Sequence, residues 1–133
     1  MIETIKIGKK VCALVVRRNF YGKEIEFFTE PEDSLQLGYM RREKGYKIQP
    51  HAHTKIIREV EFTNEVLFVK SGVVKVNFYD DEYVLFTHCV LYEGDTILLS
   101  HCGHGFEIIE DCQMLEVKQG PYAGEKDKFR FSA

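Results

Sequence analysis

The chain has 133 residues, enough for one globular domain with a working core and too few for two. Its formal charge of −3 argues against nucleic-acid binding, which usually requires a basic face. No apolar run approaches the roughly 20 residues that cross a bilayer, and the opening MIETIKIGKK lacks the apolar stretch of a signal peptide. We therefore expect a soluble cytoplasmic protein without a nucleic-acid or membrane partner.

Hydrophobic patterning favours β-structure along the whole chain. Aromatic residues make up 13% of the sequence and there are only three prolines, which favours sheet over disorder. Alternating runs are separated by turn residues about every eight to twelve positions, the pattern of an all-β sandwich or barrel. The expected strands are 10–20, 21–30, 35–43, 47–53, 56–62, 65–72, 73–80, 82–92, 96–100, 106–109 and 112–120, with turns at Ser71–Gly72 and Glu110–Asp111.

The cysteines show no recognisable spacing. Cys12, Cys89, Cys102 and Cys112 form neither a CxxC pair nor a zinc-finger pattern. We therefore expect free thiols, each acting as a small buried hydrophobe. Cys102 is the exception, because it lies two residues from His104 and could share its face as a pocket thiol.

The residues with the clearest chemistry centre on His51-Ala52-His53. In a strand, residues two apart share one face with Cα atoms roughly 6.5–7 Å apart, so both imidazoles can reach one cation. Glu65 follows in a run whose alternate residues would share a face, and His104 comes later in HCGHGFEII. Three imidazoles and one carboxylate suit a divalent first-row metal.

Other polar residues are candidates for a pocket around this site. Tyr39 and Arg41 alternate on the expected strand 35–43, and Glu116 shares one face of the last strand with Lys118. Charged residues on the inward face of a barrel are costly unless they bind something. The alternative is that Arg41 and Lys118 point outward into solvent. The candidate pocket residues are Tyr39, Arg41, Cys102 and Glu116.

Two stretches of the chain resemble the cupin motifs. The spacing Gly45, five residues, His51-x-His53, and later Glu65, six residues, Gly72, resembles the first motif, and Gly94-Asp95 to His104 resembles the second. The resemblance covers about 38–119. It implies a single domain over 1–133 with a double-stranded β-helix (jelly-roll) cupin barrel, N-terminal strands within 10–30, and a tail over 122–133.

The same resemblance implies a metal site and a homodimer. It assigns His51, His53, Glu65 and His104 as ligands of one divalent transition metal, which would be Fe, Mn, Ni, Zn or Co. His104 is preferred because HGF stands where the second motif ends, although His101 competes with it as the third histidine. His88 has no partner signal and is expected at the surface. A barrel without metal is the alternative.

The closing run HGFEIIEDCQMLEVKQGPY resembles small cupins encoded among genes for surface-polysaccharide and nucleotide-sugar synthesis. It implies a small polar ligand of the sugar type and, by association, a place in polysaccharide biosynthesis. The first interpretation is a metal-dependent isomerase or lyase acting on such a ligand. An Fe(II)-dependent oxygenase of the three-histidine type and a small-ligand-binding cupin without turnover are the alternatives.

Overall fold

The computed structural model describes residues 1–132, with 47% of the chain in strands and 3% in helix. The expected all-β class is confirmed. The chain divides into two compact units, Tyr21–Glu61 and a larger unit made of Met1–Phe20 and the chain from Phe62 onward. We describe each unit by itself. The jelly-roll barrel and the single domain stay predictions.

The strands of the larger unit form one antiparallel sheet. They are β1 (Ile2–Ile7), β2 (Lys10–Val16), β5 (Glu65–Tyr79), β6 (Leu85–Tyr92), β7 (Thr96–Leu99) and β8 (Gly103–Lys118), followed by a 3-10 turn, η1 (Gly124–Asp127). The order is β1-β2-β7-β5-β6, with β8 also paired to β5. The smaller unit contains β3 (Ile25–Phe27) and β4 (Gly38–Met40), which pair with each other.

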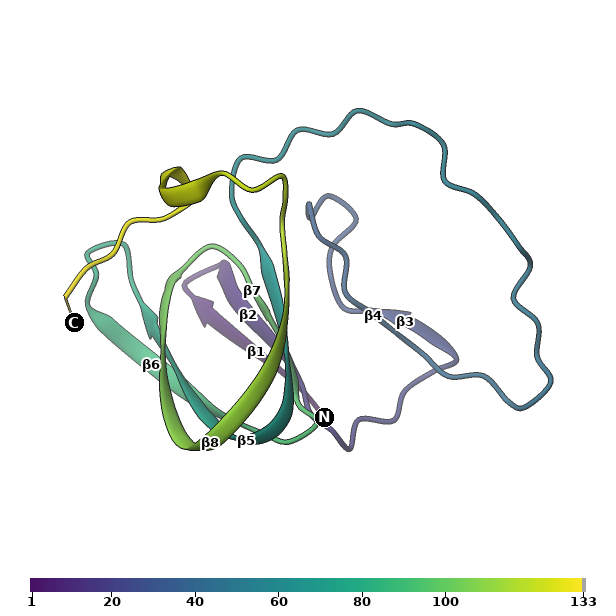
Figure 1. Ribbon diagram of the computed structural model, residues 1–133, viewed down its shortest axis with the longest axis horizontal. Helices are drawn as coiled ribbons and strands as arrows, with labels where there is room; N and C mark the ends of the chain where they lie inside the picture. The colour runs from purple at the N-terminus through teal and green to yellow at the C-terminus, as the bar shows by residue number, and fades with distance from the viewer. Residues whose placement is uncertain (133) are drawn as a thin grey trace. The chain divides into compact units, whose positions relative to one another are not determined.

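Strand β5 connects the rest of the sheet because it pairs with three strands. Its residues Glu65–Phe68 lie between β7 and β8, and Val73–Tyr79 lie between β6 and β8. The long β5–β8 ladder has register shifts in its middle, between Val69 and Val74. Such bulges bend and twist a strand pair, and Figure 1 shows both strands curving together into a U.

The bend depends on a glycine. Gly72 has φ +88°, and a Cβ built on it would lie 2.1 Å from the backbone oxygen of Asp111 on β8. The turns expected at Ser71–Gly72 and Glu110–Asp111 are therefore wrong, because the chain passes through both positions as bulged strand. Glycine and short polar residues mark turns and bulges alike, so the sequence pattern does not separate the two.

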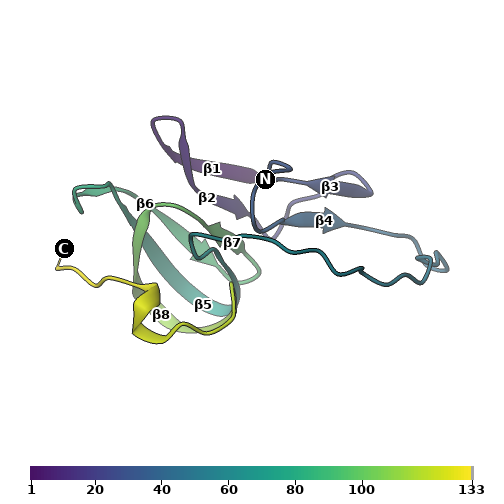
Figure 2. The same cartoon turned by 90° about the horizontal axis from the view of Figure 1, so that it is seen from above.

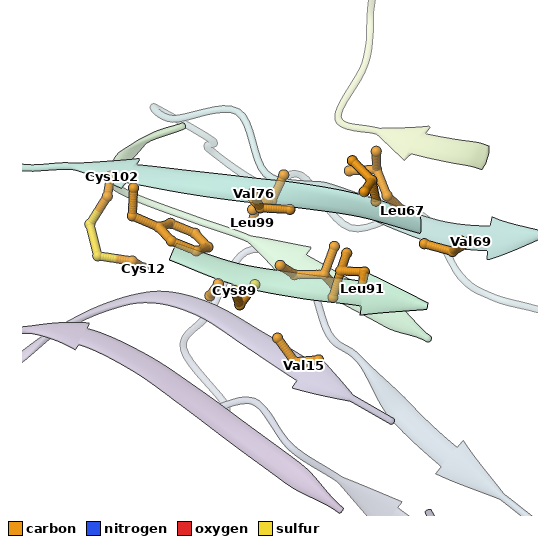
Figure 3. Close-up of a cluster of buried hydrophobic side chains, with 13 residues drawn as sticks. Cys12, Val15, Leu67, Val69, Val76, Cys89, Leu91, Leu99 and Cys102 are labelled. Carbon is orange, nitrogen blue, oxygen red and sulfur yellow. A yellow bond between two sulfur atoms is a disulfide. The ribbon is translucent and has the colours of Figure 1, made fainter. Parts of the chain in front are cut away.

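The hydrophobic core lies between β2, β5, β6 and β7 (Figure 3). It follows the alternation of those strands, because inward residues that are directly opposite across the ladders are buried together. Burying each large aliphatic side chain contributes roughly 1.5–3 kcal/mol. The core residues are Cys12, Ala13, Val15, Leu67, Val69, Val74, Val76, Phe78, Cys89, Leu91, Ile97, Leu99 and Cys102.

A disulfide within this core corrects the expectation of free thiols. Cys12 and Cys102 are bonded, which joins β2 to the segment before β8 (Figure 3). The two cysteines are 90 residues apart, so no local spacing could reveal the pair. Cys89 and Cys112 are free, and burial raises the pKa of the Cys89 thiol to about 11. Stable disulfides are uncommon in the cytosol, and the cytoplasmic location stays a prediction.

A buried carboxylate ties the N-terminal strands to the turn between β6 and β7. Asp95 is 3% exposed and accepts hydrogen bonds from the Arg17 guanidinium (2.9 Å) and from the backbone N–H groups of Arg18 and Tyr92 (both 2.8 Å). Arg17 also binds Glu3 on β1 at 2.7 Å. The Gly94-Asp95 pair that resembles a cupin motif therefore has a structural role here.

The strands expected at 47–53 and 56–62 are wrong, because residues 41–64 contain neither strand nor helix. The expected strand 35–43 is reduced to β4, and that at 21–30 to β3. The expected strand 10–20 ends at Val16, and β1 was not expected at all. An alternating pattern forms a strand only where a neighbouring edge accepts its hydrogen bonds, and Pro50 lacks the N–H to offer one.

Substituting Gly72 tests the bend. We expect Gly72→Ala to cost more than about 3 kcal/mol of unfolding free energy, because the methyl group overlaps the backbone of β8. Gly8→Ala is the matched control: Gly8 also has positive φ, +60°, but nothing lies within 4 Å of its Cβ, so only about 1–2 kcal/mol is expected. Urea unfolding measures both, and equal losses would show that the close approach at Gly72 is unimportant.

Candidate functional site

Two polar side chains from opposite ends of the β5–β8 ladder meet in space. In the ladder, Glu65 pairs with Lys118, and His104 pairs with Phe78. Nevertheless His104 Nε2 lies 3.6 Å from Glu65 Oε1, and the two side chains are only 23% and 17% exposed. The curl of the ladder brings its two ends together, so this site is a consequence of the bend at Gly72.

Both side chains lie on the core face of the sheet. Glu65 alternates with Leu67 and Val69, which are fully or almost fully buried, and this confirms the expected shared face. His104 is directly opposite the buried Phe78, and opposite residues of an antiparallel pair project to the same side. The site therefore forms at the edge of the core rather than on the outer surface.

Glu116 completes a pair of carboxyl groups. It is directly opposite Leu67 in the ladder, which puts it on the face of Glu65. The His104 ring lowers the pKa of Glu65 against the opposing effect of burial, and the neighbouring Glu116 carboxyl group lowers it further. Burial and the neighbouring Glu65 raise the pKa of Glu116. Of the two carboxyl groups, Glu116 is therefore the one that is protonated more readily.

A salt bridge lies next to these carboxyl groups. Lys118 Nζ is 3.1 Å from Asp127 Oδ2 in η1, and the Thr63 hydroxyl donates to the other oxygen of Asp127. The hydrogen bond with Asp127 raises the pKa of Lys118, and the hydrogen bonds from Thr63 and Lys118 lower the pKa of Asp127. Sequence reasoning missed Thr63 and Asp127, which belong to no motif. The alternation of Glu116 and Lys118 along the last strand was the one sequence feature that pointed to charged side chains on this face.

The C-terminal tail runs across this region. Asp127 binds near the start of β5, whereas the Phe131 ring contacts the Tyr79 ring at the end of β5, with centroids 5.1 Å apart. The Phe129 ring lies 5.5 Å from that of Tyr83. In Figures 1 and 2 the tail, drawn in yellow, leaves the end of β8 and turns back toward the other end of the ladder. The tail therefore connects the two ends that the bend brings together.

The remaining histidines have separate locations. His51 and His53 belong to the unit Tyr21–Glu61, where their exposed rings are in edge-to-face contact with centroids 5.5 Å apart. The strand expected to carry them is absent, yet the two imidazoles do lie side by side. His101 contacts Phe62, with ring centroids 5.9 Å apart, and His88 is exposed on β6.

The candidate pocket residues have different environments. Glu116 lies beside Glu65, as described above. Tyr39 and Arg41 belong to the smaller unit, where Tyr39 pairs with Glu26 and the Arg41 guanidinium donates to the Gly22 carbonyl at 2.7 Å. Cys102 is buried in the core with no free thiol, so the pocket thiol considered there as an alternative is wrong.

The donor chemistry of Glu65 and His104 suits a divalent metal. Metal–ligand bonds of about 2.0–2.2 Å place two ligand atoms roughly 3–3.5 Å apart, close to the 3.6 Å between Oε1 and Nε2. Within residues 1–132, no three His, Cys, Asp or Glu side chains are grouped as a metal site. The four-ligand set His51, His53, Glu65 and His104 stays a prediction.

No protein-family model, curated protein or solved structure matches the chain. The resemblance to cupins therefore stays a prediction that depends on the motif residues. Within residues 1–132, no helix has the length and apolar character needed to cross a bilayer.

The raised pKa of Glu116 predicts how stability depends on pH. A carboxyl group with a raised folded-state pKa stabilises the fold below its unfolded-state pKa of about 4.3, and that contribution is lost as pH rises through the folded-state pKa. We expect Glu116→Gln to raise the thermal midpoint at pH 7 and to leave it unchanged near pH 3. Glu110→Gln removes a negative charge from the same strand and is the control. A lower midpoint for Glu116→Gln at pH 7 would contradict the raised pKa of Glu116.

Proposed function

We propose that this protein binds a small polar ligand of the sugar type through a divalent transition metal held by Glu65 and His104. The observation that supports this most directly is the meeting of these two side chains at 3.6 Å on the core face. Carboxylate with imidazole accommodates Mn, Fe, Co, Ni and Zn. A cation bound there supplies Lewis acidity toward a carbonyl or hydroxyl oxygen.

The surrounding side chains have complementary roles in this proposal. The pKa of Glu116 is raised and that of the neighbouring Glu65 is lowered, and two carboxyl groups whose pKa values are pushed apart are suited to separate acid and base roles. The Phe106 ring, 38% exposed, contacts the His104 ring with centroids 5.6 Å apart. An apolar ring beside a few polar groups is the usual composition of small-ligand sites.

We also propose a homodimer. Among the strands described, β8 pairs only with β5, so one edge of this 16-residue strand is unpaired. Natural proteins generally cover or interrupt long edges, because an open edge accepts another strand. Sedimentation velocity measures the state directly, and we expect twice the chain mass of 15.5 kDa. A monomer at micromolar concentration would overturn this part of the proposal.

Metal titration tests the ligand assignment. Protein purified without an affinity tag should contain about one equivalent of a first-row metal by elemental mass spectrometry. We expect Glu65→Gln and His104→Ala to weaken affinity at least about tenfold by calorimetry, since even outer-shell changes commonly cost 10–100-fold. The same titration on His51→Ala and His53→Ala tests whether these histidines also ligate the ion.

His88→Ala and His101→Ala are the matched controls and should leave metal content unchanged. Circular dichroism of each variant separates lost ligation from lost folding. Equal metal loss in His101→Ala would show that His101 is the third histidine of the set. No binding by the unmodified chain, even with metal added back, would overturn the proposed metal site.

A further inference from the structure

Lys118 is positioned to compete with a metal ion for the carboxyl groups of Glu65 and Glu116. It is the direct partner of Glu65 in the β5–β8 ladder, and side chains so paired have Cβ atoms about 4.5–5.5 Å apart on one face. Glu116 lies two residues before Lys118 on the same face. A lysine carries a compact positive charge on a flexible four-carbon stem. Its ammonium group can therefore reach the carboxyl groups that would hold a cation.

In the structure the ammonium group is held elsewhere. Lys118 Nζ lies 3.1 Å from Asp127 Oδ2, and the side chains of this pair are 27% and 15% exposed. The other carboxylate oxygen of Asp127 accepts a hydrogen bond from the Thr63 hydroxyl, two residues before Glu65. The rings of Phe129 and Phe131 anchor the following residues of the tail. The position of Lys118 therefore depends on the docked tail.

We propose that Asp127 is a positioning residue that holds Lys118 away from Glu65 and Glu116, and that undocking of the tail lets the Lys118 ammonium group take the place of the metal ion. This inference rests on the proposed function, because it concerns the same site. Two neighbouring carboxyl groups attract any nearby cation, and a tethered ammonium group is present at an effective concentration in the millimolar range. Docking of the tail and binding of metal are then positively coupled.

The coupling has a reciprocal consequence. If the docked tail favours metal binding, bound metal must favour the docked tail by the same factor. Saturating MnCl₂ should therefore slow proteolytic cleavage of the tail after Lys126 and Lys128. The tail would act as a sensor of site occupancy through one salt bridge rather than through a movement of the sheet.

A double-mutant cycle with metal alone tests the proposal. We expect Asp127→Asn to weaken Mn²⁺ affinity at least about fivefold by calorimetry, the lower range of measured site coupling. Adding Lys118→Met to Asp127→Asn should restore the wild-type affinity, because no ammonium group remains to compete. Glu125→Gln is the matched control. Glu125 lies in the same 3-10 turn as Asp127, but its carboxylate binds Arg130 and not Lys118. Failure of the second substitution to restore affinity would overturn the proposal.

A second measurement needs no metal. Carboxyl-carbon NMR shifts of Glu65 and Glu116, recorded at fixed pH 8 without metal, should move in Asp127→Asn and return in the double variant. If the wild-type chain binds no metal but these shifts move as expected, the proposed metal site fails and the role of Asp127 stands. If the wild-type chain binds Mn²⁺ and Asp127→Asn binds it equally well, the role of Asp127 is overturned and the metal site stands.

Discussion

The close approach of Gly72 to the backbone of Asp111 is the constraint on which the rest of the structure depends. At this point β5 and β8 are too near for a side chain, and the register shifts on either side allow the ladder to bend. Without the bend, Glu65 and His104 would lie at opposite ends of a straight ladder. The same bend lets one strand pair with β7 at its beginning and β6 at its end. Fold and site therefore share one cause.

The charge arrangement at the edge of the core is the basis for the cation site that we propose there. Three carboxyl groups, of Glu65, Glu116 and Asp127, lie near two basic side chains, those of His104 and Lys118. Burial and the neighbouring Glu65 carboxylate disfavour the ionised form of Glu116, and its pKa is raised as a result. Either a proton or a metal ion relieves this repulsion, whereas an anion would increase it. A site with these side chains is therefore suited to cations and to proton transfer.

Sequence reasoning predicted the parts of this structure that depend on alternation. The all-β class and the shared face of Glu65, Leu67 and Val69 follow from residue types and period-two patterning. The Cys12–Cys102 disulfide and the contact of Glu65 with His104 depend on where β2, β5 and β8 meet, which no local pattern contains. In the segment 41–64 the sequence predicted strands that the structure does not contain. The alternation of this segment is real, but strands need a neighbouring edge, and the structure provides none for it.

The tail shows why the site cannot be understood from its candidate ligands alone. Thr63 lies just before β5 and Asp127 lies in η1, and neither belongs to a motif, yet they determine where the charge of Lys118 lies. Because Lys118 faces Glu65 across the ladder, we propose that its ammonium group, which binds Asp127 in the structure, can bind the carboxyl pair instead. Both arrangements pair the Lys118 ammonium group with a carboxyl group, so a small change in the tail can shift the equilibrium between them. An exposed C-terminal segment thereby acquires control over a site that the sheet itself assembles.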